Sequence, residues 1–127
     1  MKHLGRHVLA EICGCDFDIL NDIEKVEDIM VNAALEAGAE VRECIFHKFS
    51  PQGVSGVVVI SESHLAIHTW PELGYAAVDV FTCGDKVNPW DACNYLTDHF
   101  NAKQTTAREM KRGLIPDDVY LRKAVNL

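Results

Sequence analysis

Residues 61–64 (Ser-Glu-Ser-His) are the groups of this chain best suited to chemistry, and they separate two apolar runs. The run 57–60 has the composition of a buried strand, and so has the run 65–70, which Pro71 closes. A tight connection between strands usually carries Gly or Asn, whereas this one carries two hydroxyls, a carboxylate and an imidazole. Such groups, held between two rigid strands, could form a catalytic site.

The residue pattern alone leaves the kind of site open. A serine hydrolase would place Gly-x-Ser-x-Gly at a strand-to-helix turn, but the segment 53–56 does not match, and a strand follows Ser63. His64 and His68 share one face of a strand, about 13 Å apart, and no third metal ligand is evident, so no metal site is predicted. The alternative to an active site is a polar hairpin that contains a hydrogen-bonded histidine.

Composition limits the class of protein. The chain has 127 residues, 48% of them hydrophobic and 24% charged, which is typical of one globular domain. No apolar run approaches the roughly 20 residues of a membrane helix, and no signal-peptide core precedes the first strand. A net charge of −7 argues against nucleic-acid binding and permits a cationic small ligand.

The cysteines indicate a reducing compartment. Five cysteines without framework spacing are expected to be reduced thiols of a cytoplasmic protein. Cys13 and Cys15 could be half of a metal or redox site, but no second pair completes it, so they are more simply structural.

Hydrophobic periodicity supplies the elements that position these groups. Alternation predicts strands over residues 5–12, 40–49, 57–60, 65–70, 75–83 and 103–110. A first helix is expected to end at Ala37, and the capping-box spacing of Asn21 and Glu24 would start it at Asn21. A second helix is expected from Asn88, its N-cap, to about Phe100. A loop and a loosely held tail are predicted from Gly113 onward.

This order of elements predicts an α+β fold. Because the middle strands follow one another through short turns, the sheet should be largely antiparallel, with both helices packed on one face of a two-layer sandwich. The other face of the sheet would remain uncovered in a monomer.

Two long stretches of sequence resemble one family closely. SGVVVISESHLAIHTWPE (residues 55–72) and GYAAVDVFTCG (residues 74–84) resemble the prokaryotic S-adenosylmethionine decarboxylase proenzymes. GRHVLAE (residues 5–11) and FHKFSPQGVSG (residues 46–56) are similar to that family as well. The resemblance covers about residues 4 to 93.

The resemblance implies a pyruvoyl enzyme made by self-cleavage between Glu62 and Ser63. The Ser63 hydroxyl would attack the Glu62 carbonyl carbon, and elimination of the resulting ester would leave dehydroalanine, which hydrolyses to a pyruvoyl group with loss of ammonia. The single domain would thereby become a beta chain, residues 1–62, and an alpha chain, residues 63–127. In the family, the histidine that matches His68 is the base in processing, and the serine that matches Ser55 assists by hydrogen bonding.

The resemblance also implies the substrate and the reaction. The amine of S-adenosylmethionine would form a Schiff base with the pyruvoyl ketone, which takes up the electrons released with CO2. Cys83 would return a proton to Cα, Phe49 would stack on adenine or face the sulfonium, and Glu72 would hold the ribose hydroxyls. Without the resemblance, Cys83 would be interpreted as a small buried residue, Phe49 as a core residue and Glu72 as a turn residue. The product would supply aminopropyl groups for spermidine biosynthesis.

The family also predicts a partner and leaves two alternatives. A homodimer of cleaved protomers is implied, and its composite site would combine two groups of residues: Ser63 and Cys83 from one protomer, with Phe49, Ser55, His68 and Glu72 from its neighbour. One alternative is an arginine decarboxylase that shares the pyruvoyl machinery. The other is a non-catalytic ligand-binding relative, which would remain one chain near 14.2 kDa.

Overall fold

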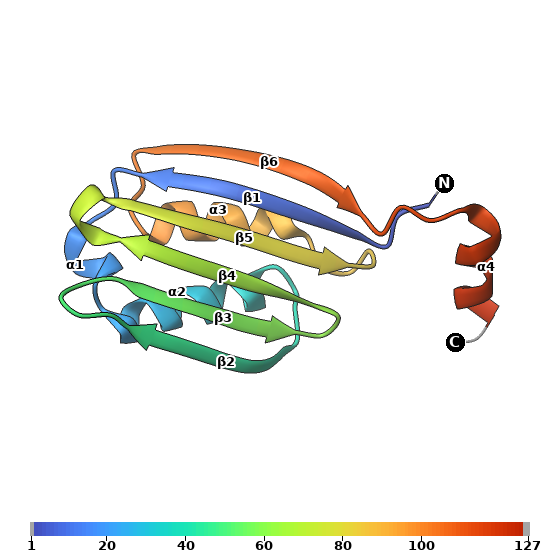
Figure 1. The fold of residues 1–127 in the computed structure, drawn as a ribbon, viewed down its shortest axis with the longest axis horizontal. Helices are drawn as coiled ribbons and strands as arrows, with labels where there is room; N and C mark the ends of the chain where they lie inside the picture. The colour runs from blue at the N-terminus through green and yellow to red at the C-terminus, as the bar shows by residue number, and fades with distance from the viewer. Residues whose placement is uncertain (1, 126–127) are drawn as a thin grey trace.

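A six-stranded antiparallel sheet forms one layer of the molecule (Figure 1). The computed structural model describes residues 2–125. The strands are β1 (Gly5–Cys13), β2 (Val41–Lys48), β3 (Val54–Ile60), β4 (Ser63–Trp70), β5 (Tyr75–Cys83) and β6 (Gln104–Arg112), in the spatial order β2-β3-β4-β5-β1-β6. The helical segments are α1 (Phe17–Leu20), α2 (Ile23–Glu36), the 3-10 turn η1 (Pro71–Leu73), α3 (Pro89–His99) and α4 (Asp117–Val125).

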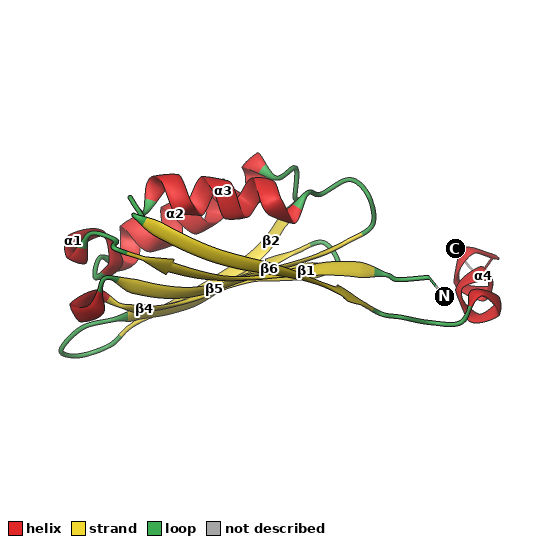
Figure 2. Ribbon diagram, turned by 90° about the horizontal axis from the view of Figure 1, so that it is seen from above, coloured by secondary structure: helices red, strands yellow, loops and turns green. Residues whose placement is uncertain are grey.

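Both long helices, α2 and α3, cover the same face of the sheet, which confirms the predicted two-layer α+β sandwich (Figure 2). The core lies between the layers, because alternate strand residues point toward the helices. In β1 these residues are Val8, Ala10 and Ile12, as predicted. The helices contribute Val26, Met30, Ala33, Ala34, Cys93 and Leu96, together with Phe100, which follows α3.

The opposite face of the sheet, here called the open face, carries apolar side chains that remain exposed. Leu9, Ile45, Val59 and Met110 are 47%, 67%, 39% and 58% exposed, respectively. Each alternates along its strand with residues that face the helices. Ile45 and Val59 lie on β2 and β3 at one side of the sheet, and Leu9 and Met110 lie on β1 and β6 at the other.

The first predicted helix is wrong in its start, because the chain breaks between α1 and α2. Asp22, not Asn21, caps α2: its side chain accepts hydrogen bonds from the backbone N–H groups of Glu24 and Lys25. The side-chain oxygen of Asn21 instead accepts from the backbone N–H of Gly53, in the loop before β3. Asn21 therefore connects the break to that loop.

The C-terminal prediction was also wrong, because residues 117–125 form α4 rather than a loop. Pro116 precedes two acidic residues, Asp117 and Asp118, which favour a helix N-terminus. Arg122 lies 3.7 Å from Asp118 one turn earlier. The helix projects beyond the end of the sheet (Figure 1). Within residues 2–125, no helix has the length and apolar character needed to cross a bilayer.

Candidate active site

The hairpin between β3 and β4 is tighter than predicted. Ile60 pairs with Ser63, so only Ser61 and Glu62 form the connection, and Ser63 and His64 already belong to β4. Glu62 has a φ of +71°. Positive φ confined to the second loop residue is the pattern of a type II turn, which favours Gly or Asn there. The backbone is therefore strained next to the predicted cleavage site.

The strained turn places the Ser63 hydroxyl between two other groups of the predicted site. It contacts the carbonyl oxygen of Glu62, the residue before it. It also lies 3.2 Å from the sulfur of Cys83, the last residue of β5. Gly5 lies opposite Cys83 in the register of β1, where a Cβ would come within 2.6 Å of the Thr82 carbonyl oxygen and 3.1 Å of the Cys83 sulfur. Glycine at this position leaves room for the backbone of β5 as well as for the thiol.

A second cluster lies at the other end of β4. Ser55 and His68 are directly opposite in the register of β3 and β4, and the Ser55 hydroxyl oxygen is 2.8 Å from His68 Nδ1. They line a cavity of about 330 Å³ together with Phe49, Trp70 and Glu72. The structure thus brings four of the predicted residues, Phe49, Ser55, His68 and Glu72, into one cavity.

The two clusters are well separated within one chain. Four residues of β4 lie between Ser63 and His68, and the five residue steps correspond to about 17 Å of extended strand between their Cα atoms. A separate cavity of about 370 Å³ adjoins the first cluster and is lined in part by Glu62 and Cys83. Within one protomer, Glu72 and Cys83 therefore line different cavities.

Comparison with known proteins assigns the family. The family model for S-adenosylmethionine decarboxylase matches residues 6–113. The chain belongs to the S-adenosylmethionine decarboxylase family. It is 87% identical over 127 residues, the full length of both chains, to the S-adenosylmethionine decarboxylase proenzyme of Pelotomaculum thermopropionicum. It is 77% identical over 115 residues to the proenzyme of the same name from Moorella thermoacetica, covering 91% of this chain and 92% of the relative.

The fold of this S-adenosylmethionine decarboxylase family member is also similar to a solved structure. The crystal structure of the adenosylmethionine decarboxylase from Aquifex aeolicus VF5 superposes with a TM-score of 0.86. The two sequences are 34% identical, and the match covers 92% of this chain and 97% of the other. The predicted architecture is therefore confirmed by a relative as well as by the topology.

Trp70 lines the second cavity and was not predicted from the sequence as a site residue. Its place two residues after His68 puts both rings on one face of β4, with their centroids 6.5 Å apart. Trp70 also stacks on Tyr75 across the turn, at 5.3 Å between ring centroids. The hydrogen bond that the Tyr75 hydroxyl donates to Glu11 raises the pKa of Tyr75 to about 12, so the phenol stays neutral. The same-face spacing was the signal that could have identified Trp70.

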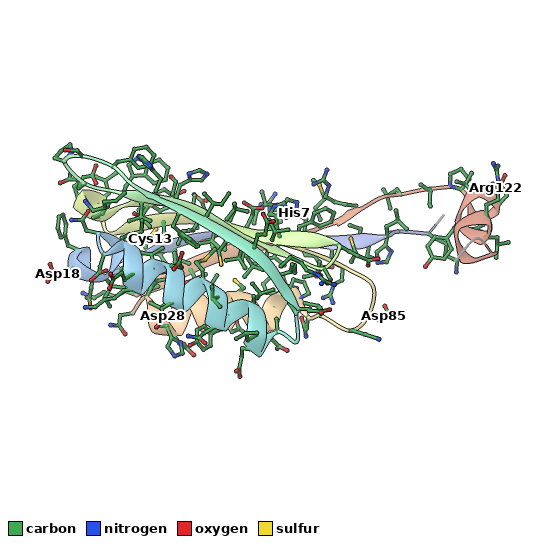
Figure 3. All side chains as sticks on the ribbon, turned by 90° about the horizontal axis from the view of Figure 1, so that it is seen from below. His7, Cys13, Asp18, Asp28, Asp85 and Arg122 are labelled. Atoms are coloured by element: carbon green, nitrogen blue, oxygen red, sulfur yellow. The ribbon has the colours of Figure 1, made fainter. Side chains whose placement is uncertain are left out.

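His64 has different neighbours from those considered in the sequence. The sequence suggested His68 as the histidine to consider together with His64 as a metal ligand. In the structure, His64 instead contacts Asp79 on β5, and Asp79 also contacts His7 on β1. Figure 3 labels His7, which lies on the sheet far from Arg122 on α4. Among the residues that the structure describes, these three are the one group of His, Cys or acidic side chains spaced to share a metal ion. Cys13 and Cys15 are not part of it.

Proposed function

We propose that this chain is a self-cleaving, pyruvoyl-dependent enzyme that decarboxylates S-adenosyl-L-methionine to S-adenosylmethioninamine, the aminopropyl donor for spermidine. The observation that carries the proposal is the Ser63 hydroxyl, which contacts the Glu62 carbonyl in a strained turn and lies 3.2 Å from the Cys83 sulfur. Both curated relatives described above are named for S-adenosylmethionine and neither for arginine, which favours the same substrate here.

The residues at the turn fit the formation of a pyruvoyl group. The Ser63 oxygen bonds to the Glu62 carbonyl carbon and the C–N bond breaks, which gives an ester and a free amine. Attack from the adjacent residue gains from proximity, and the left-handed φ of Glu62 adds strain that cleavage relieves. Loss of the Cα proton of residue 63 then breaks its Cβ–Oγ bond, which leaves a carboxylate on Glu62 and dehydroalanine at position 63. Water adds to Cα of the imine tautomer and ammonia leaves, so that a ketone begins the chain 63–127 and Glu62 ends the chain 1–62.

The cleaved chains are proposed to work as a homodimer. About 17 Å of strand separates Ser63 from His68. A second copy therefore brings its own cavity, which Phe49 and Glu72 line, to the Ser63 end of the first. The open face offers the exposed side chains of Leu9 and Met110 for this contact. In such a dimer, His68 and Ser55 of one protomer act on the Glu62–Ser63 bond of the other.

The two halves of this composite site have different tasks. A pyruvoyl group supplies the electron sink for decarboxylation. Phe49 and Trp70 present aromatic faces to adenine and the sulfonium, and Glu72 accepts hydrogen bonds from the ribose hydroxyls. Cys83, next to position 63, delivers the proton to Cα of the substrate. We place the enzyme in the cytoplasm, in keeping with its five free thiols.

The decisive test joins mass spectrometry to an assay of CO2 release. The purified chain should separate into two fragments that meet between Glu62 and Ser63. The Ser63→Ala chain should remain intact near 14.2 kDa and release no CO2. Carboxyl-labelled S-adenosylmethionine and arginine, assayed side by side, distinguish the two substrates. Undiminished CO2 release by Ser63→Ala would refute the pyruvoyl mechanism, and release from arginine alone would refute the substrate.

A further inference from the structure

Three side chains from neighbouring strands meet on the open face beside the cleavage site. Asp79 Oδ2 lies 2.8 Å from His7 Nε2 and 2.8 Å from His64 Nε2. His7 and His64 are both directly opposite Phe81 in the register, one from β1 and one from β4, and Asp79 is two residues away on the same face. Asp79 thus ties β4 and β1 to β5. The side chains of His7, Asp79 and His64 are 14%, 28% and 34% exposed.

The contacts of His7 define which atoms donate. Arg112 Nη1 lies 3.3 Å from His7 Nδ1, and a guanidinium only donates, so Nδ1 accepts. The proton of the neutral imidazole is then on Nε2, which donates to Asp79. Because the same carboxylate oxygen faces His64 Nε2, that nitrogen also donates. Each contact is a hydrogen bond to a charged acceptor, which is stronger than one between neutral groups.

This arrangement disfavours a metal ion, although the ligand atoms lie within 4.8 Å of one another. A metal would take the lone pair of His7 Nε2 and leave the proton on Nδ1. That proton would point at the Arg112 guanidinium, whereas metal-binding histidines donate this second N–H to an acceptor. Hydrogen bonding therefore explains the cluster better than metal binding.

Cleavage changes what holds the beginning of β4. Before cleavage, Ser63 is tied to β3 through the two-residue loop and through its pairing with Ile60. In the proposed reaction the loop is cut and the nitrogen of residue 63 leaves as ammonia, so that pairing loses its backbone donor. A new chain end tends to fray unless a side chain fixes it. The first residue available for this is His64.

We propose that His64 is a positioning residue. Through Asp79 and His7 it holds the start of β4, and the group at position 63 with it, within reach of Cys83 once the chain is cut. The inference rests on the self-cleavage proposed above. His7 lies in the 1–62 fragment, whereas Asp79 and His64 lie in the 63–127 fragment. The cluster therefore also joins the two products.

The experiment compares His64→Leu with His64→Gln, since glutamine retains an N–H donor near the position of Nε2. Amide hydrogen exchange is measured for the peptide that begins at residue 63, in the cleaved protein and in the uncleavable Ser63→Ala background. In cleaved His64→Leu, this peptide should exchange about tenfold faster, but in the Ser63→Ala background the same substitution should have little effect. His64→Gln should restore most of the protection.

Kinetics supply the second measurement. Misplacement of the reacting group should lower kcat of His64→Leu about tenfold and change KM less than about threefold, because the residues assigned to adenine and ribose lie in the other cluster. Glu109→Gln is the matched control, since it removes a polar contact between β1 and β6 away from β4, and its kcat should be unchanged. If His64→Leu fails to fold, His7→Leu tests the same tie from its other end and should show a smaller loss in the same direction.

Three results would overturn the proposal. One is equal exchange in cleaved His64→Leu and the cleaved parent protein. Another is equal losses in the Leu and Gln variants, which would assign the effect to the ring itself. The third is stoichiometric Zn2+ binding that His64→Leu abolishes, which would make the cluster a metal site. Failure of self-cleavage in the parent chain would show in its intact mass, so it would be distinguished from all three.

Discussion

The sulfur of Cys83 lies 3.2 Å from the hydroxyl oxygen of Ser63, although 20 positions separate the two residues in sequence. Ser63 is the first residue of β4, and Cys83 is the last residue of its neighbour β5. Antiparallel pairing brings these two strand ends together. A proton donor is thus placed one hydrogen bond away from the residue that we propose becomes the reactive group.

Replacing Cys83 by alanine should leave self-cleavage intact and lower kcat for decarboxylation by about a hundredfold or more, because the proton donor is lost. Cys83→Ser keeps a hydroxyl donor of similar size and should lose less. CO2 release, measured on protein whose cleavage has been verified by mass, gives both values. A Cys83→Ala chain that stays intact would instead assign Cys83 to processing.

The composite site predicts complementation between two inactive variants. Ser63→Ala lacks the reactive group, and Glu72→Gln is impaired in the substrate cavity, so each should have little activity alone. When the two are co-expressed, about half of the dimers are mixed, and one of the two sites in each mixed dimer is complete. Total CO2 release should therefore reach about a quarter of the parent value.

The matched control combines two variants from the same half of the site. Phe49→Ala and Glu72→Gln both alter the substrate cavity, so neither site of their mixed dimer is complete and activity should stay low. Recovery in this control would show that Phe49 and Glu72 of one site come from different protomers. Its absence with Ser63→Ala and Glu72→Gln would show that one protomer supplies a whole site.

Most of the sheet could be predicted because its strands alternate and end at turn residues. The bounds 75–83 were predicted for β5 without error, since Gly74 and Gly84 flank an alternating run. The break between α1 and α2 was missed because it depends on contacts remote in sequence, such as that between Asn21 and Gly53. The helix α4 was missed because Pro116 and its acidic neighbours also suit a turn.

The family resemblance grouped Ser63 with Cys83, and Phe49 with Ser55, His68 and Glu72, and the structure has two corresponding clusters, but Trp70 was not predicted. Family resemblance supplied Ser63, Cys83 and the four residues of the cavity. The contact of His64 with Asp79 is diagonal across two strands, and such contacts depend on a register that one sequence does not reveal.

The strained turn predicts that Glu62→Gly slows self-cleavage. Glycine adopts a φ of +71° without the cost of a Cβ, which is about 1 kcal/mol. Relief of that strain in the intact chain should slow cleavage about fivefold. Cell-free synthesis, followed by arrest of translation and electrophoresis at intervals, would measure the rate. Glu62→Ala retains a Cβ and should cleave at the parent rate, so equal rates for the Gly and Ala variants would contradict a role for strain.

The carboxylate of Glu109 predicts a defined acid sensitivity of folding. Hydrogen bonds from Arg6 and Trp90 hold the pKa of Glu109 below its usual 4.5, so the folded chain binds this proton less readily than the unfolded chain. The stabilisation of the folded chain by the charged Glu109 is complete above the unfolded pKa of 4.5. It is lost as the pH falls through the lower pKa of Glu109 in the folded chain. The difference in free energy of unfolding between the parent and Glu109→Gln should thus be largest above about pH 5 and shrink at lower pH. Urea unfolding at one protein concentration, from pH 3 to pH 7, measures it, with Arg6→Gln expected to show the same trend. A difference that does not change with pH would exclude the charge of Glu109 as its source.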